Sequence, residues 1–148
     1  MQELSKEEIE EIEKNPERVD WNNICYNRKL SEEFIRKFCD RVHWFHVSWY
    51  QNLSEEFIRE FSDKVCWNHV SYKQKLSKEF IKEFCDKINW VGLIFNNNLS
   101  EEIILEFYEK VNWRILDKKN KFNKVIFEKM NGEQKLYMIM NYRELWNK

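Results

Sequence analysis

Apolar and polar residues recur along this chain with a period of 23 residues. The clearest copy begins at Leu53 and ends at Trp67. Its apolar positions are the first, fifth, sixth and ninth, which hold Leu53, Phe57, Ile58 and Phe61. This spacing places the four side chains on one face of a helix. A period of this length is typical of solenoids, in which each repeat buries its apolar face against its neighbours.

The period divides the chain into about six units. They cover residues 4–29, 30–52, 53–75, 76–98, 99–121 and 122–144. The first unit contains three extra residues near Pro16, and the last loses the tryptophan that the others carry at their fifteenth position. We expect these two irregular units to cap the array. A chain of 148 residues is typical of one domain, here residues 1–148.

The first half of each unit predicts a short helix. The serine after the first residue is a natural N-cap, and glutamate in the next positions suits the positive end of the helix dipole. The leucine before the cap and an isoleucine five residues later form a hydrophobic staple. The predicted capping residues in the regular units are Ser31, Ser54, Ser77 and Ser100.

The second half of each unit predicts another short helix, which carries the tryptophan. We expect an acidic residue to cap it, at Asp40, Asp63, Asp86 or Glu109. Strand alternation fits Val65 and Trp67 equally well, but it does not continue. The sequence therefore predicts an all-α solenoid, an array of about six 23-residue helix–turn–helix repeats.

Two sets of aromatic residues follow the period. The tryptophans at 21, 44, 67, 90 and 113 favour a core role, although they could also stack on bases or sugars. A second series lies five residues further on, at Tyr26, Trp49, Tyr72 and Phe95, and ends with Lys118. Five residues turn a helix by about 140°, so this series leaves the tryptophan face. It either packs between repeats, which we favour, or forms an exposed binding strip.

Residues near this series vary from unit to unit, and repeat proteins place recognition at variable positions on a fixed frame. Two sets of variable positions stand out, one a helical turn before the series and one directly before it. The first set is Asn22, Phe45, Asn68, Val91 and Arg114. The second set is Cys25, Ser48, Ser71, Ile94 and Asp117. Aromatic anchors beside mixed polar residues are typical of protein-binding surfaces. The candidate binding residues are Tyr26, Phe45, His46, Trp49, Asn68, His69, Tyr72, Phe95, Arg114 and Lys118.

Charge narrows the choice of partner. The net charge is −1, which makes nucleic acid an unlikely general partner. Single-stranded nucleic acid or a small ligand stacked on the aromatic series remains an alternative, with help from Lys73, Lys118, Lys119 and Lys121. Residues 1–20 hold eight acids and three bases, whereas residues 110–148 hold ten bases and four acids. These opposite ends favour a second alternative, head-to-tail association into a homo-oligomer.

The sequence suggests no enzyme, metal or cofactor. It contains no phosphate-binding loop and no motif of a hydrolase or metalloprotease. A zinc site could be formed by His43, His46 and His69, but the spacing of these histidines matches no established motif. The four cysteines show no disulfide spacing, and no apolar run is long enough to span a membrane. The acidic N-terminus does not resemble a signal peptide, so we expect a cytoplasmic protein with reduced thiols.

The segment from Leu53 to Trp67 resembles tandem repeats found in proteins of large DNA viruses, phages and some bacteria. The resemblance is close over residues 30–121 and looser at both ends. It implies a repeat architecture and no catalytic residues. It also implies that the protein partner is a host factor, for example one of host defence, which the chain would inhibit in the host cytoplasm.

Overall fold

The computed structural model describes residues 1–96, 99–118 and 124–146. The chain divides into two compact units, residues 1–74 and 75–148, and each is treated by itself below. This division falls one residue before a predicted repeat boundary. In the described residues, helices make up almost all of the regular structure. A two-residue parallel pairing joins β1 (Gln2–Glu3) to β2 (Arg28–Lys29).

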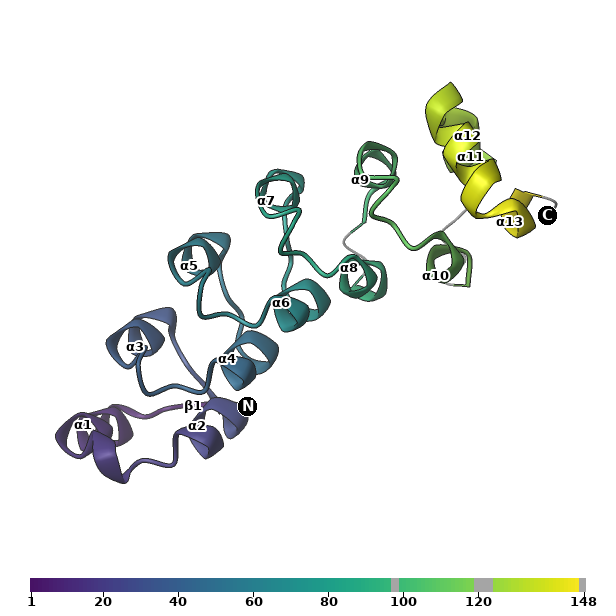
Figure 1. Cartoon of the computed structure of the whole chain (residues 1–148). Coiled ribbons are helices and arrows are strands. Elements are labelled where there is room, and N and C mark those ends of the chain that lie inside the picture. The colour runs from purple at the N-terminus through teal and green to yellow at the C-terminus, as the bar shows by residue number, and fades with distance from the viewer. Residues whose placement is uncertain (97–98, 119–123, 147–148) are drawn as a thin grey trace. The chain divides into compact units, whose positions relative to one another are not determined.

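The first unit is a double row of helices, as the period predicts (Figure 1). One row holds the first helix of each repeat, namely α1 (Lys6–Lys14), α3 (Glu32–Lys37) and α5 (Glu55–Glu60). The other holds the second helices, namely α2 (Trp21–Asn27), α4 (Trp44–Tyr50) and α6 (Trp67–Lys73). A 3-10 turn, η1 (Pro16–Arg18), takes up the extra residues of the first repeat. Both helices of each repeat are therefore confirmed, and the strand alternative is wrong.

The second unit repeats this arrangement and ends differently. Its regular part contains α7 (Lys78–Glu83), α8 (Trp90–Asn96), α9 (Glu101–Glu106) and α10 (Trp113–Lys118). The irregular end contains α11 (Lys124–Lys129), α12 (Gly132–Asn141) and α13 (Arg143–Trp146). Helix α12 begins four residues before Leu136, which occupies the tryptophan position of the repeat. No helix in the described ranges is both long and apolar enough to cross a bilayer.

Serine caps start the first helices as predicted. The Ser31 hydroxyl accepts a hydrogen bond from the backbone N–H of Phe34 at 3.1 Å. The same bond forms at Ser54, Ser77 and Ser100. In α1, Ser5 and Glu8 complete a capping box. Each cap satisfies one of the backbone donors that a helix N-terminus leaves without a partner.

The predicted acidic caps of the second helices are wrong. The residue directly before the tryptophan is the cap, and it lies three residues beyond each predicted acid. Asp20, Asn89 and Asn112 accept backbone bonds there, whereas His43 and Cys66 make no side-chain cap. The predicted acids fall in the turn between the helices. There, Asp40 and Asp86 instead accept bonds from Lys64 and Lys110 of the next repeat.

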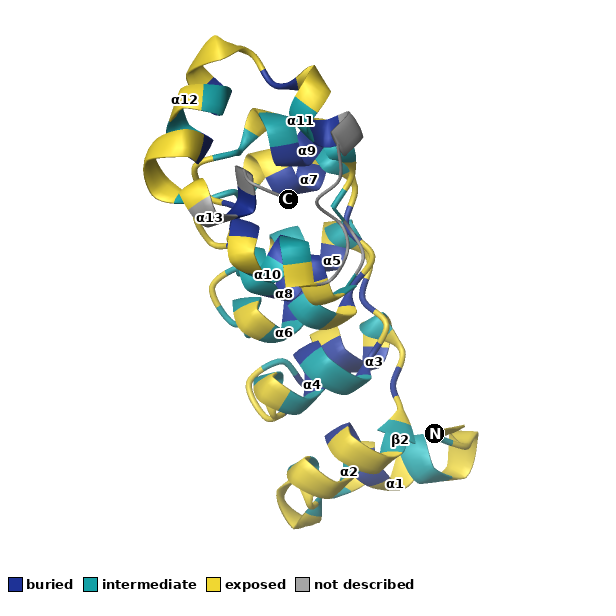
Figure 2. Ribbon diagram, turned by 90° about the vertical axis from the view of Figure 1, so that its right-hand side faces the viewer, coloured by how far each residue is buried: buried dark blue, intermediate teal, exposed yellow. Residues whose placement is uncertain are grey.

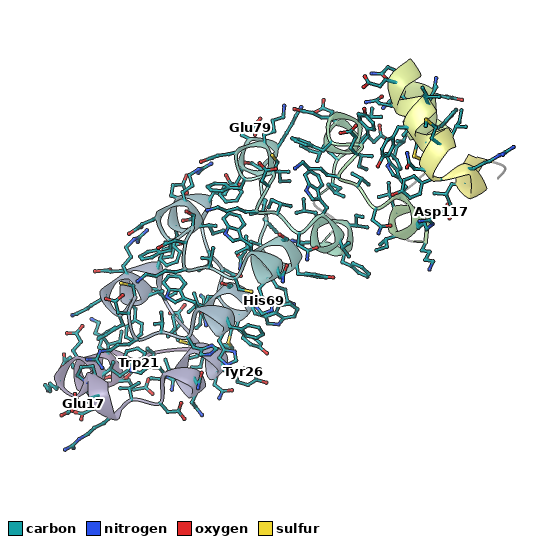
Figure 3. The ribbon with its side chains drawn as sticks, in the orientation of Figure 1. Glu17, Trp21, Tyr26, His69, Glu79 and Asp117 are labelled. Atoms are coloured by element: carbon teal, nitrogen blue, oxygen red, sulfur yellow. The ribbon has the colours of Figure 1, made fainter. Side chains whose placement is uncertain are left out.

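Each tryptophan fastens the two helices of its repeat. The indole N–H of Trp44 donates to the carbonyl of Cys39 at 2.9 Å, and the other four make the same bond five residues back. The Trp44 ring also packs on Phe57 and Phe61 of the next repeat, with centroids 6.2 and 4.9 Å away. Trp113 is fully buried and the others are half-buried, so their predicted core role is confirmed. Trp21 can be followed between the two rows in Figure 3.

Two buried glutamines join successive repeats of the first unit. The side chain of Gln51 accepts a bond from the Leu30 N–H and donates to the carbonyls of Cys25 and Arg28. One repeat later, Gln74 makes the equivalent bonds to Leu53, Ser48 and Gln51. Both side chains satisfy main-chain groups where the chain leaves a second helix. This contact fixes α2, α4 and α6 beside one another.

Candidate functional site

The second helices of the first unit turn one side toward the first-helix row and the other outward. Figure 2 shows this division of each helix into buried and exposed sides. In Figure 3, Tyr26 and His69 lie on the outer side of the second-helix row, away from Trp21. The outer side carries a set of rings that we call the aromatic face. It consists of Tyr26, Phe45, His46, Trp49, Tyr50, His69 and Tyr72.

The rings of the aromatic face touch in an unbroken series across three repeats. Tyr26 on α2 meets His46 and Tyr50 on α4, with centroids 5.7 and 4.7 Å away. His46 in turn lies 5.7 Å from the Phe45 ring. The series continues onto α6, since Phe45 and Trp49 lie 4.0 and 4.6 Å from His69. Most of these pairs meet edge to face, which is a favourable geometry for aromatic rings.

The rings of the aromatic face pack against one another and are also partly exposed to solvent. Tyr26 and Phe45 are 48% and 51% exposed. Trp49 and Tyr72 are half-buried, and their ring centroids lie 6.4 Å apart. The second aromatic series thus packs between repeats, as favoured from the sequence, and is also partly exposed, while binding at it stays a prediction. Contacts between repeats hold the rings in place, and their outer surfaces remain accessible to solvent.

Polar groups fix the edge of the face formed by α6. The His69 Nδ1 atom lies 3.1 Å from the backbone carbonyl oxygen of Phe45, which makes it the donor of that hydrogen bond. The Lys73 ammonium lies 4.5 Å from the centre of the Trp49 ring. A cation in this position is attracted by the ring and adds rigidity. Asn68, also a predicted site residue, is exposed in the first turn of α6.

His46 is a half-buried polar side chain of the face. Its Nδ1 atom is buried and has no hydrogen-bond partner within the described residues. Burial lowers the pKa of His46 below its ordinary value of 6.5, and the neighbouring His43 and His69 lower it further. Each of these effects disfavours the charged imidazolium. Burial and the two neighbouring histidines therefore both favour the neutral form of His46.

The histidines lie close together without forming a metal cluster. The rings of His43 and His46 are 4.5 Å apart. Among the described residues, however, no group of three or more His, Cys, Asp or Glu side chains is placed to hold a metal ion. All four cysteines are free thiols.

Three predicted site residues belong to the second unit. Phe95 on α8 is 45% exposed, and Lys118 is exposed at the end of α10. The Arg114 guanidinium lies 5.1 Å above the ring of Tyr142. These side chains are accessible in their own unit.

One part of the sequence interpretation is wrong. Cys25, Ser48, Ser71 and Ile94, which directly precede the aromatic series, are completely buried and do not offer variable recognition side chains. The Ser48 hydroxyl instead bridges repeats, since it donates to the Trp44 carbonyl and accepts from the Cys66 N–H. The positions one turn before the series are exposed at Asn22, Phe45, Asn68 and Arg114.

Sequence reasoning also missed Tyr50. Its repeat position is held by Asn27, Lys73 and Asn96 in neighbouring units, so the period gave no aromatic signal there. A search for aromatic residues next to Trp49 on the same helix would have found it.

Comparisons of the chain with protein-family models, with curated proteins and with solved structures found no match.

Proposed function

We propose that this chain is a non-catalytic helical repeat protein that binds another protein through the aromatic face. The observation that carries the proposal is the unbroken series of ring contacts from Tyr26 to Tyr72, with Tyr26 and Phe45 about half exposed. Tyrosine and tryptophan are enriched among the residues that dominate binding energy at protein interfaces.

The scaffold supports this role because it immobilises the rings before any partner arrives. Gln51 and Gln74 tie the three helices together, and His69 and Lys73 of the third repeat hold Phe45 and Trp49 of the second. Fixed side chains lose little freedom on binding, so more of their contact energy becomes affinity. The resemblance to viral and phage repeats favours a host factor as the partner and inhibition in the host cytoplasm as the outcome.

A pair of matched variants tests the proposal. Phe45→Ala removes an exposed ring from the aromatic face, and Met140→Ala removes an apolar side chain that is 74% exposed on α12. Each variant and the wild type would serve as bait for host-cell protein, with circular dichroism as a check of folding. We expect specific partners to bind the wild type and Met140→Ala and to be lost with Phe45→Ala. Partners that bind all three baits equally would contradict the assignment of the face.

Binding of single-stranded nucleic acid is a second candidate. The Lys73 ammonium above Trp49 favours it, because stacking rings beside cations are the usual means of holding such strands. Fluorescence anisotropy with an oligothymidylate at low salt tests it. Binding that weakens steeply with added salt would support this function, and absence of binding at low salt would remove it.

Self-association is a third candidate. Leu136, Ile139 and Met140 leave one side of α12 apolar and exposed. At the acidic N-terminus, Glu3, Glu8 and Glu13 already pair with Lys29, Arg28 and Lys37 within the first unit. Light scattering over a range of protein and salt concentrations tests whether the chain self-associates. A monomer under all conditions would exclude self-association.

A further inference from the structure

The acidic residues of the first unit are unevenly distributed between its two rows of helices. Every Asp and Glu of residues 1–74 lies in β1, in a first helix or in the segments between helices. Helices α2, α4 and α6 contain none. The nearest acid in sequence is Asp20, the N-cap of α2.

The acids of the first-helix row are partly neutralised by partners from neighbouring repeats. Lys37 pairs with Glu13, Arg36 with Glu60 and Lys64 with Asp40, at 2.6, 2.7 and 2.6 Å. At the start of the chain, Arg28 and Lys29 are held in the same way by Glu8 and Glu3. These basic residues are engaged away from the aromatic face.

Lys73 brings a positive charge to the aromatic face, whereas other basic residues such as Lys6 and Arg41 lie outside α2, α4 and α6. Lys73 lies over Trp49, and His69 lies between Phe45 and Trp49. His43 stands at the edge of the face, 6.2 Å from the Phe45 ring. Exposed amides and phenols add donors, for example Asn68 and Tyr26. The face thus combines rings, neutral donors and positive charge without a carboxylate.

We propose that the aromatic face takes an acidic segment of a partner protein, with apolar side chains that sit on the rings and carboxylates that reach Lys73. This inference rests on the proposed protein-binding function and adds the chemistry of the partner. Complementary charge favours encounter with such a segment and disfavours basic ones. The absence of carboxylates on α2, α4 and α6 removes the repulsion that an acidic segment would otherwise meet.

The same observations favour a protein over a nucleic acid. Lys73 is the sole Lys or Arg within α2, α4 and α6, which the structure describes completely. A nucleic-acid backbone carries one charge per nucleotide and is bound by several cations along its path. An acidic peptide needs far fewer, because apolar anchors supply most of its affinity.

Selection from a random peptide library displayed on phage tests the inference with the full chain. Wild type, Lys73→Glu and Lys6→Glu would be used in parallel. Lys6→Glu is the matched control, because it makes the same charge change at an exposed position in the first turn of α1. We expect acidic peptides with apolar residues to be enriched by the wild type and by Lys6→Glu. Their dissociation constants should rise at least about fivefold with Lys73→Glu.

Each outcome has a distinct meaning. Peptides that depend on Phe45 but show no acidic bias would overturn this inference and leave the proposed function standing. Acidic peptides that bind Lys73→Glu as tightly as the wild type would overturn the role of Lys73. If no peptide depends on Phe45 while an oligothymidylate binds, both the inference and the protein-binding function are wrong. A Lys73→Met variant, which keeps most of the aliphatic stem, would show whether Lys73→Glu fails through misfolding.

Discussion

Some single side chains in this protein join two successive repeats. Gln51 makes three hydrogen bonds to main-chain groups, two of them in the preceding repeat, while only 2% of it is exposed. Trp44 bonds within its own repeat and packs on the next. Both side chains act at a junction between successive repeats. Substitutions of these side chains should lower the free energy of unfolding by more than the change in side-chain size suggests.

We predict that Gln51→Leu lowers the free energy of unfolding by about 3 kcal/mol. Leucine has a similar volume, but it leaves the Leu30 N–H and two carbonyls buried without partners. Urea unfolding followed by circular dichroism measures the change. The control is Asn52→Ala at the next, exposed position, which should have little effect. A loss below about 1 kcal/mol for Gln51→Leu would show that water replaces these bonds.

The lowered pKa of His46 predicts that the stability of the folded chain depends on pH. Its pKa is lowered in the folded state from an ordinary 6.5, so the unfolded chain binds a proton more readily. The stabilisation from neutral His46 is therefore complete above about pH 6.5 and is lost as the pH falls below that value. We expect the urea midpoint to fall between about pH 7.5 and pH 5.5, and to fall less for His46→Phe. The same decrease in both proteins would assign the effect to other groups.

At the scale of the element, caps decide where each helix begins. The serine caps follow from local sequence, and the structure places each as predicted. The second helices start three residues later than their acids suggest, because the first helix is followed by a turn that ends directly before tryptophan. The two units also differ at one buried position, where Ile94 of the second unit stands in place of Ser48 and Ser71 of the first.

The cap assignment predicts a contrast between two substitutions. Ser31→Ala should lower the unfolding free energy by about 1 kcal/mol, because it removes the acceptor for the Phe34 N–H. Asp40→Ala should have a clearly smaller effect, since Asp40 makes a solvent-exposed ion pair with Lys64 and caps no helix. Ser31→Asp, which keeps an acceptor, is the control. The reverse order of the first two losses would refute the corrected cap positions.

At the scale of the whole molecule, stability in a repeat array is a sum of units and of interfaces between neighbours. The chain divides into two compact units, 1–74 and 75–148. Each has its own buried residues, such as Ile58 in the first and Leu116 in the second. A perturbation should therefore be felt most in the unit where it is made.

We predict that Ile58→Ala weakens the first unit preferentially. Ile58 is completely buried, and its truncation should cost about 3 kcal/mol. Hydrogen exchange read by mass spectrometry should show a larger loss of protection in α3 to α6 than in α12. Leu116→Ala is the matched control, and it should show the opposite pattern. An equal loss of protection throughout the chain would indicate that the two units unfold together.

The sequence by itself determined the repeat, the alternation of two helices, the serine caps and the core role of tryptophan. These features depend on spacing of 23 residues and on contacts within a few residues, which a linear pattern records. It also indicated Tyr26, Trp49 and Tyr72, because they recur in register. Tyr50 and the acid-free outer side of α2, α4 and α6 lie outside any such register.

Only the tertiary structure decided which variable positions are buried and which side chains meet across repeats. Ser48 and Gln51 are polar and look exposed in a linear sequence, yet both are buried and form hydrogen bonds with main-chain groups of adjacent repeats. The contact of Phe45 with His69 joins residues 24 positions apart, and the distance depends on how α4 packs on α6. Such contacts arise from stacking of whole helices, and local sequence does not encode their geometry.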